Sequence, residues 1–197
     1  MEFIVLGVVA SVFVASWALW KKTRSPSGAG VPADESSIKG QLTSGERTIH
    51  NLQVSDIVTH LGSDFLVEGV LTLDDDGAVT RMYRMTDGAK VRWLVARPGD
   101  GNPLLLEEKA ELAVDASGPE AISHGGVPYR LAARASVRVV RSGALASSRT
   151  TDRARLYEYA SAGEARIIAL AWPDTERADA TIGERLSLGS FDILPGR

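Results

Sequence analysis

The chain has 197 residues, of which 44% are hydrophobic and 24% charged, and its formal net charge at pH 7 is −3. This length is enough for one domain with its own hydrophobic core and some appendages. The chain has no cysteine, which excludes disulfides, cysteine-type zinc sites, iron–sulfur clusters and thiol catalysis. Its near-average composition excludes collagen, a long coiled coil and wholesale disorder.

The first segment, residues 3–20, is apolar and uncharged, and three cations follow it within residues 21–24. As a helix it would be about 27 Å long, close to the roughly 30 Å hydrocarbon core of a bilayer. A cleaved signal peptide is the alternative, but it carries its positive charge before the apolar run. Here Glu2 precedes the run and the cations follow it, so the pattern favours a retained anchor over residues 1–24. By the positive-inside rule the chain is predicted to be single-pass, with its N-terminus outside and the rest in the cytoplasm.

Small residues recur every four positions in this segment, at Gly7, Ser11 and Ala15. In a helix they form one stripe, and such stripes allow two membrane helices to approach closely. The stripe is a candidate helix-packing surface and leaves a homo-oligomer open. The alternative is that small residues are simply common in membrane helices.

Residues 25–48 are rich in Ser, Gly, Pro and Ala and lack an apolar period, which predicts a flexible linker to a domain over residues 49–197. Without the first 24 residues the chain has 19 Lys+Arg against 24 Asp+Glu, a net charge of −5. That balance argues against a nucleic-acid partner, whose phosphates need cations, and against a domain that lies flat on anionic lipid.

From residue 54 onward, short apolar runs alternate with turn signals at the spacing of strands. Residues 64–73 lead into an acidic hairpin turn at residues 74–77, and further strand-like runs follow. Residues 149–159 are the one stretch in which a helix competes with a strand. The domain is therefore predicted to be all-β.

A weak duplication runs through this domain. Tyr83 precedes Arg92 by nine residues, and Tyr157 precedes Arg166 by the same number. The residues after Gly62 resemble those after Gly126, and the final stretch near residues 182–194 resembles the opening strand, against which it is expected to close the sheet. The two half-repeats, about 54–112 and 122–195, predict two antiparallel meanders that pack as a sandwich or as a pair of small barrels.

Several short motifs follow one another over residues 52–195. Their residues are Leu52, Val54, Asp56, Ile57, Val58, Gly62, Phe65, Val67, Gly69, Val70, Tyr83, Arg92, Trp93, Leu94, Tyr157, Tyr159, Gly183, Glu184, Phe191, Ile193 and Leu194. The order of these motifs resembles the bacterial Domain of Unknown Function 4178 family. Ser55 stands where the family pattern has a glycine before Asp56, a departure that affects one turn.

The family has no established activity to carry over. The resemblance implies an accessory protein of a bacterial membrane-associated system, encoded near phage-shock-type stress proteins, small multi-span membrane proteins and spermidine-synthase-like proteins. With the predicted anchor, it places the chain in the bacterial inner (cytoplasmic) membrane, with a membrane protein or membrane-associated protein as its partner.

The sequence predicts no catalytic, cofactor or metal site. The histidines His50, His60 and His124 do not share metal-ligand spacing, and the acidic run at residues 74–77 lacks the later ligands of a calcium loop. Nucleotide-binding glycine loops and a serine nucleophile elbow are also missing from the sequence.

One locally basic stretch, residues 141–155, is a candidate interaction surface through Arg141, Arg149, Arg153 and Arg155. A solvated loop between the half-repeats is the alternative reading of the same residues. Together these features favour a membrane-tethered, non-enzymatic adaptor or sensor without a cofactor. The alternative is a domain that binds or processes a small metabolite, with a polyamine as the example that the resemblance implies, so catalysis stays open.

Overall fold

The structure is a computed structural model that describes residues 47–99, 101–109, 111–145 and 151–196. The chain divides into two units, Met1–Ser44 and Gly45–Arg197, and every described residue belongs to the second. Among the described residues no helix has the length and hydropathy to cross a membrane. The predicted anchor, the stripe of Gly7, Ser11 and Ala15 and nearly all of the predicted linker lie outside the described residues.

The described part of the chain is all-β, as the alternation of apolar runs and turns predicts. One short 3₁₀ turn, η1 (Leu188–Ser190), accompanies the strands. The strands are β1 (Ile57–His60), β2 (Ser63–Asp75), β3 (Ala78–Asp87), β4 (Lys90–Ala96), β5 (Leu104–Glu108), β6 (Val114–Asp115), β7 (Ala121–His124), β8 (Val127–Gly143), β9 (Arg153–Ala160), β10 (Ala165–Ala171), β11 (Arg177–Arg185) and β12 (Asp192–Leu194).

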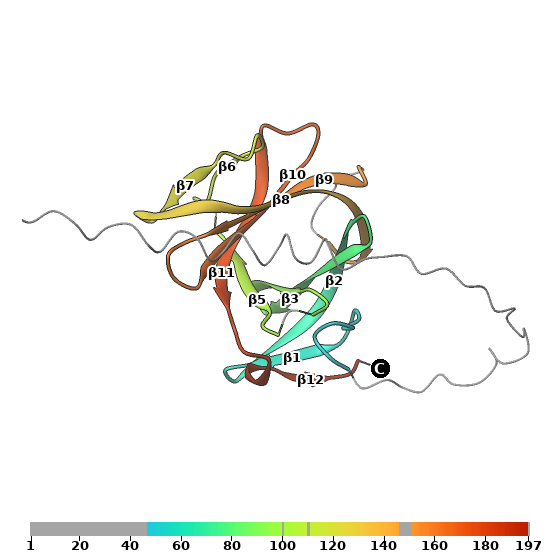
Figure 1. The fold of residues 1–197 in the computed structure, drawn as a ribbon. Coiled ribbons are helices and arrows are strands. Elements are labelled where there is room, and N and C mark those ends of the chain that lie inside the picture. The colour runs from blue at the N-terminus through green and yellow to red at the C-terminus, as the bar shows by residue number, and fades with distance from the viewer. Residues whose placement is uncertain (1–46, 100, 110, 146–150, 197) are drawn as a thin grey trace, which may run out of the picture. The chain divides into compact units, whose positions relative to one another are not determined.

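Eight of these strands close into one antiparallel barrel (Figure 1). Strands β2–β5 form one meander, here the first half, and β8–β11 form the second half. Two seams join the halves, because β2 pairs with β8 and β5 pairs with β11. The expectation of a sandwich or of two small barrels is therefore corrected. A four-stranded meander alone has two edge strands, whose outer backbone N–H and C=O groups lack hydrogen-bond partners. Pairing each edge strand with an edge strand of the other meander supplies those partners at both seams.

The two halves match in detail beyond their strand order. A β-bulge interrupts the pairing of β2 with β3 between Val67 and Gly69, and another interrupts the pairing of β8 with β9 between Leu131 and Ala133. Both bulges follow a two-residue turn by the same number of residues, the first after Gly62 and the second after Gly126. A bulge bends its strand and increases the local twist, so each half curves at the same place.

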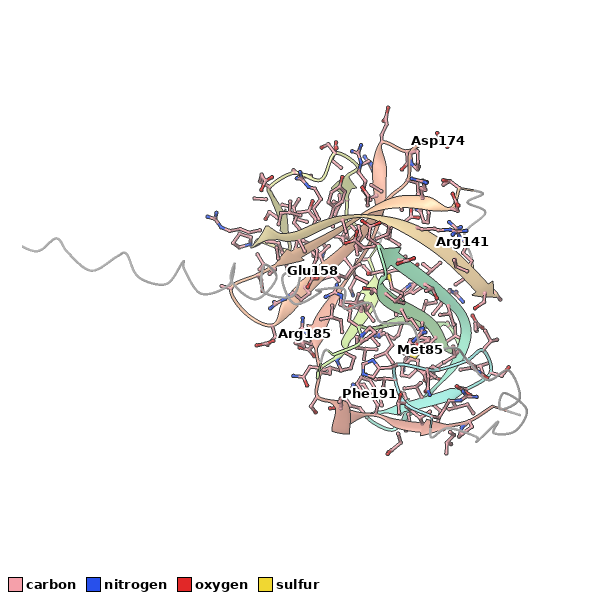
Figure 2. The ribbon with its side chains drawn as sticks, turned by 45° about the vertical axis from the view of Figure 1, so that its right-hand side comes forward. Met85, Arg141, Glu158, Asp174, Arg185 and Phe191 are labelled. Carbon is pink, nitrogen blue, oxygen red and sulfur yellow. The ribbon has the colours of Figure 1, made fainter. Side chains whose placement is uncertain are left out.

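Three hydrophobic clusters hold the described fold together. One fills the barrel, with Leu71, Leu73, Met82, Val95, Leu106, Val137, Val139, Ile168, Leu170 and Trp172. The second lies outside the first half, beneath β1 and β12, with Val58, Phe65, Val67, Tyr83, Met85, Leu94 and Phe191. The third lies outside the second half, beneath β6 and β7, with Val114, Tyr129, Tyr157, Tyr159 and Ile167. Figure 2 shows Met85 and Phe191 near one another in the second cluster.

The last strand returns to the start of the domain. β12 pairs with β1, with Val58 opposite Ile193, as the similarity between the closing and opening stretches predicts. The buried Asp56 carboxylate fastens the same junction, because it accepts hydrogen bonds from the backbone N–H of Gln53 at 2.7 Å and of Gly196 at 2.8 Å. Arg47 adds an ion pair to this carboxylate at 3.1 Å.

Candidate functional site

A pocket of about 570 Å³ lies on the outside of the barrel, across the β5–β11 seam. The β1–β2 turn forms one wall and the end of β7 forms the opposite wall, so each half of the domain supplies one side. In Figure 1, β5 and β11 run between β7 and β8 above and β1 below. We call this pocket the groove. Its volume lies within the range typical of small-molecule sites.

Two histidines stand at equivalent positions in the two walls. His60 ends β1 and pairs with Ser63 across a two-residue turn, and His124 ends β7 and pairs with Val127 across another. Both imidazoles line the groove. The His60 ring is held from behind, because its Nδ1 lies 2.9 Å from the carbonyl oxygen of Ser190 and the ring stacks on Phe191.

The turn beside His60 carries a leucine in an unfavourable backbone conformation. Leu61 and Gly62 both have positive φ, 49° and 77°, as a type I′ hairpin turn requires. The equivalent turn of the second half has glycine at both positions, Gly125 and Gly126, with φ of 59° and 76°. Leu61 is 91% exposed at the rim of the groove, so the fold gains almost no burial from this side chain.

The floor of the groove is partly apolar. Leu105 on β5 and Ile182 on β11 lie in it, directly opposite Glu184 and Glu107 across the seam, and Ala165 and Leu186 also line the groove. The four apolar side chains are half-buried, because they also pack against the hydrophobic clusters outside the barrel. Apolar contact area combined with a few polar groups is the usual character of a ligand site.

Charged side chains lie both within this floor and along the rim of the groove. Glu107 is bound on both sides, by Arg92 at 2.9 Å and by Lys109 at 2.6 Å. The hydrogen bond from Lys109 is the main cause that lowers the pKa of the Glu107 carboxyl, with a contribution from the charge of Arg92, while burial opposes them. Lys90 lies 4.0 Å from Asp87 and is well exposed at the rim. Among the described residues that line the groove, the remaining carboxylate is Glu184 on β11.

This arrangement can bind a ligand through apolar contact and several N–H donors. Among the described residues no group of three or more His, Asp or Glu side chains could hold a metal ion. The two neighbouring carboxylates at the end of β5 have different surroundings. Glu107 is bound within the groove, whereas Glu108 accepts a hydrogen bond from the indole of Trp93 at 2.8 Å.

The structure separates Arg141 from Arg153 and Arg155, the other described members of the predicted interaction surface. Arg141 lies on β8 and turns into the barrel, where its guanidinium stacks 4.8 Å from the centre of the Trp172 ring. Its Nε and Nη2 are buried and make no hydrogen bond to any residue that the structure describes. Arg149 lies outside the described residues. The loop expected over residues 141–155 is also shorter, since β8 extends to Gly143 and β9 begins at Arg153.

Arg153 and Arg155 instead project outward from β9 beside two arginines of β8, Arg134 and Arg138. We call these four residues the arginine face. Arg138 and Arg153 are directly opposite one another across the two strands, and Arg138 also lies 3.8 Å from Asp152. Two like charges in such a cross-strand pair are unfavourable for the sheet.

The groove was not predicted from the sequence because neither His60 nor His124 has a second candidate site residue close to it in the chain. The signal that reveals it is the similarity between the residues after Gly62 and those after Gly126, which places His60 and His124 at the same point of the repeat.

Comparison with known proteins identifies one family. A family model described as Domain of unknown function (DUF4178) matches residues 53–188, which include both walls of the groove. No curated protein matches the chain. No solved structure matches it either.

Proposed function

This chain belongs to the DUF4178 family of unknown function, and we propose that it is a membrane-tethered, non-enzymatic sensor or adaptor whose recognition site is the groove. One observation carries this proposal. Leu61 occupies a left-handed turn position, at a cost of roughly 1 kcal/mol, and exposes its side chain at the rim of a pocket. Such a residue is explained by an apolar contact with a bound molecule rather than by folding.

The position of the groove supports the same function. Both halves of the barrel supply its walls, and the β5–β11 seam forms its floor. A ligand in the groove therefore contacts both meanders and one of the two seams that join them. Occupancy would stabilise the closed barrel by mass action, which is a simple way for a domain to respond to a ligand.

The proposed tether explains why the domain does not need a strong site. An anchor over residues 3–20 and a linker over residues 25–48 would confine the domain to the cytoplasmic surface of the inner membrane. Confinement raises the effective concentration of the groove for any membrane-bound partner, so that a weak contact suffices.

A second candidate function uses the arginine face. The cross-strand pair of Arg138 and Arg153 costs the sheet some stability, and an acidic segment of a membrane protein would relieve that repulsion. In this alternative the protein is an adaptor that docks through β8 and β9. The metabolite alternative fits the groove, but a polyamine would meet the cations Lys90, Arg92 and Lys109 there.

The chain has no cysteine, so single cysteines test these alternatives in the full-length protein. Leu61→Cys reports on the groove, and Val140→Cys, beside the arginine face and 54% exposed, is the matched control. We expect a maleimide to label position 61 slowly in native membranes and quickly after purification, while position 140 reacts alike in both. Protection at position 140 alone would favour the arginine face, and equal labelling at both sites in both states would refute a bound partner.

The anchor is tested with the same proteins. We expect the full-length chain to resist alkaline extraction from membranes and a chain that begins at residue 25 to appear in the supernatant. A membrane-impermeant maleimide is expected to label position 140, which is exposed and not protected in membranes, only in broken cells. Labelling in intact cells would contradict the cytoplasmic orientation.

A further inference from the structure

The groove offers two kinds of surface side by side. Leu61, Leu105 and Leu186 provide the apolar part. Lys90, Arg92 and Lys109 provide ammonium and guanidinium N–H donors along the rim. A ligand that satisfies both parts needs an apolar body and a charged end.

The charged side chains that line the groove determine whether the charged end of the ligand is an anion or a cation. Three cations line the groove against two carboxylates, Glu107 and Glu184. Glu107 is already bound by Arg92 at 2.9 Å and by Lys109 at 2.6 Å, which leaves it little capacity to attract a cationic ligand. Lys90, in contrast, is well exposed and lies 4.0 Å from the Asp87 carboxylate, so its ammonium can reach a new acceptor.

We propose that the groove binds a small amphipathic anion with a phosphate-type head, and this inference rests on the proposed function of the groove as the recognition site. The head accepts hydrogen bonds from Lys90, Lys109 and Arg92, and the apolar body packs against Leu61 and Leu105. A phosphate ester matches these donors better than a carboxylate, because it has more oxygens to share among three cations. The same chemistry exists in soluble phosphate esters and in lipid headgroups.

The three histidines of the chain allow a direct test by NMR. His60 and His124 line the groove, whereas His50 does not and is an internal control. The experiment uses the full-length protein in phosphatidylcholine nanodiscs, with histidine side chains labelled, and titrates phenyl phosphate as the probe. Inorganic phosphate and phenol test the head and the body separately, and spermidine tests the opposite charge.

We expect phenyl phosphate to shift the resonances of His60 and His124 but not those of His50, at concentrations where phosphate and phenol alone have much weaker effects. Lys90→Gln with Lys109→Gln should weaken this binding by roughly tenfold or more, since each lost charged donor removes a strong hydrogen bond. Arg177→Gln, an exposed cation at the start of β11 that does not line the groove, is the matched control and should leave the affinity unchanged.

Glu107→Gln tests the sign of the ligand's charge, because it removes a negative charge from the groove with little change in side-chain shape. The substitution releases Arg92 and Lys109 from their ion pairs, so an anion should bind roughly two- to fivefold more tightly. A cation would bind more weakly to the same variant. Nanodiscs that contain phosphatidic acid identify the source of the head, because they shift His60 and His124 without a probe only if a lipid headgroup enters the groove.

The outcomes separate this inference from the function on which it rests. If spermidine shifts His60 and His124 and phenyl phosphate does not, the anion is wrong while the groove remains a binding site. If Glu107→Gln weakens phenyl phosphate binding, the anion is also wrong. If none of the probes shifts the resonances of His60 or His124, and position 61 is unprotected in membranes, both the proposed ligand class and the proposed function of the groove are refuted.

Discussion

Arg97 and Glu158 form an ion pair inside the barrel, with Nη2 and Oε2 2.7 Å apart. Arg97 follows β4 of the first half, and Glu158 lies on β9 of the second half. Side chains along β9 alternate between the barrel interior and the outer cluster, and Glu158 is on the inward face with Leu156. Glu158 is buried among apolar side chains. The two halves are therefore joined by a charge pair through the interior as well as by their two seams.

Breaking this pair should destabilise the fold more than removing it entirely. We expect Arg97→Met to lower the free energy of unfolding by about 2–3 kcal/mol, because it leaves a buried carboxylate unpaired. The double variant Arg97→Met with Glu158→Leu should regain most of that loss. Denaturant titrations of the two single variants and the double variant measure the coupling. Additive losses would show that the pair does not join the halves energetically.

A glycine at position 55 should stabilise the domain. Ser55 has φ of 78°, a conformation that glycine adopts without a steric penalty. We expect Ser55→Gly to raise the free energy of unfolding by about 0.5–1 kcal/mol. Ser136→Gly, within the extended strand β8, is the control and should lower it. A destabilising Ser55→Gly would mean that the serine side chain is needed there.

The stability of the domain should fall above pH 10 through Tyr83. Burial raises the pKa of the Tyr83 phenol to about 12, although the charge of Arg81 opposes this shift. The unfolded chain releases this proton near pH 10 and the folded chain only near pH 12. The contribution is therefore complete below pH 10 and is lost as the pH rises to 12. Tyr83→Phe should have a shallower decline in melting temperature over that range, and an identical decline would contradict the raised pKa.

Among the turn glycines that do not lie in the β2–β8 or β5–β11 seam, Gly118 should be the one whose substitution lowers stability most. Its φ is 67°, and a Cβ atom there would overlap the ring of Tyr157, whose hydroxyl donates to the carbonyl of Ala116 at 3.0 Å. We expect Gly118→Ala to cost about 2–4 kcal/mol of stability, through both the clash and the backbone strain. Gly99→Ala has a similar φ, 87°, and open space around it, so it should cost only about 1 kcal/mol. Equal losses would show that the contact with Tyr157 is unimportant.

Local features of the fold were predictable because they depend on neighbouring residues. The acidic turn after β2 is the predicted hairpin, in which Asp76 and Gly77 have positive φ and Asp74 accepts the N–H of Gly77 at 2.7 Å. The strand character of residues 153–159, where a helix competed, is confirmed by β9. The return of the last strand to β1 is confirmed as well.

The closure of the barrel and the groove were not predictable in the same way. Both seams pair strands that are far apart in the sequence, and nothing in the local pattern of β5 or β11 specifies that the other is its neighbour. His60 and His124 line the same groove only because that closure brings the two turns to opposite sides of one seam. Arg141 looked like a surface residue, but its position in the alternation of β8 turns it toward Trp172.

The claim that the groove is the recognition site is tested most directly by a photo-crosslinking amino acid at position 61 of the full-length protein in its native membranes. Intact-mass analysis would detect either a protein partner or a small molecule. We predict one defined adduct at position 61, lost when Lys90→Glu and Lys109→Glu are added, and no such adduct from position 140. An adduct from position 140 alone, or one at position 61 that survives both charge reversals, would contradict the account.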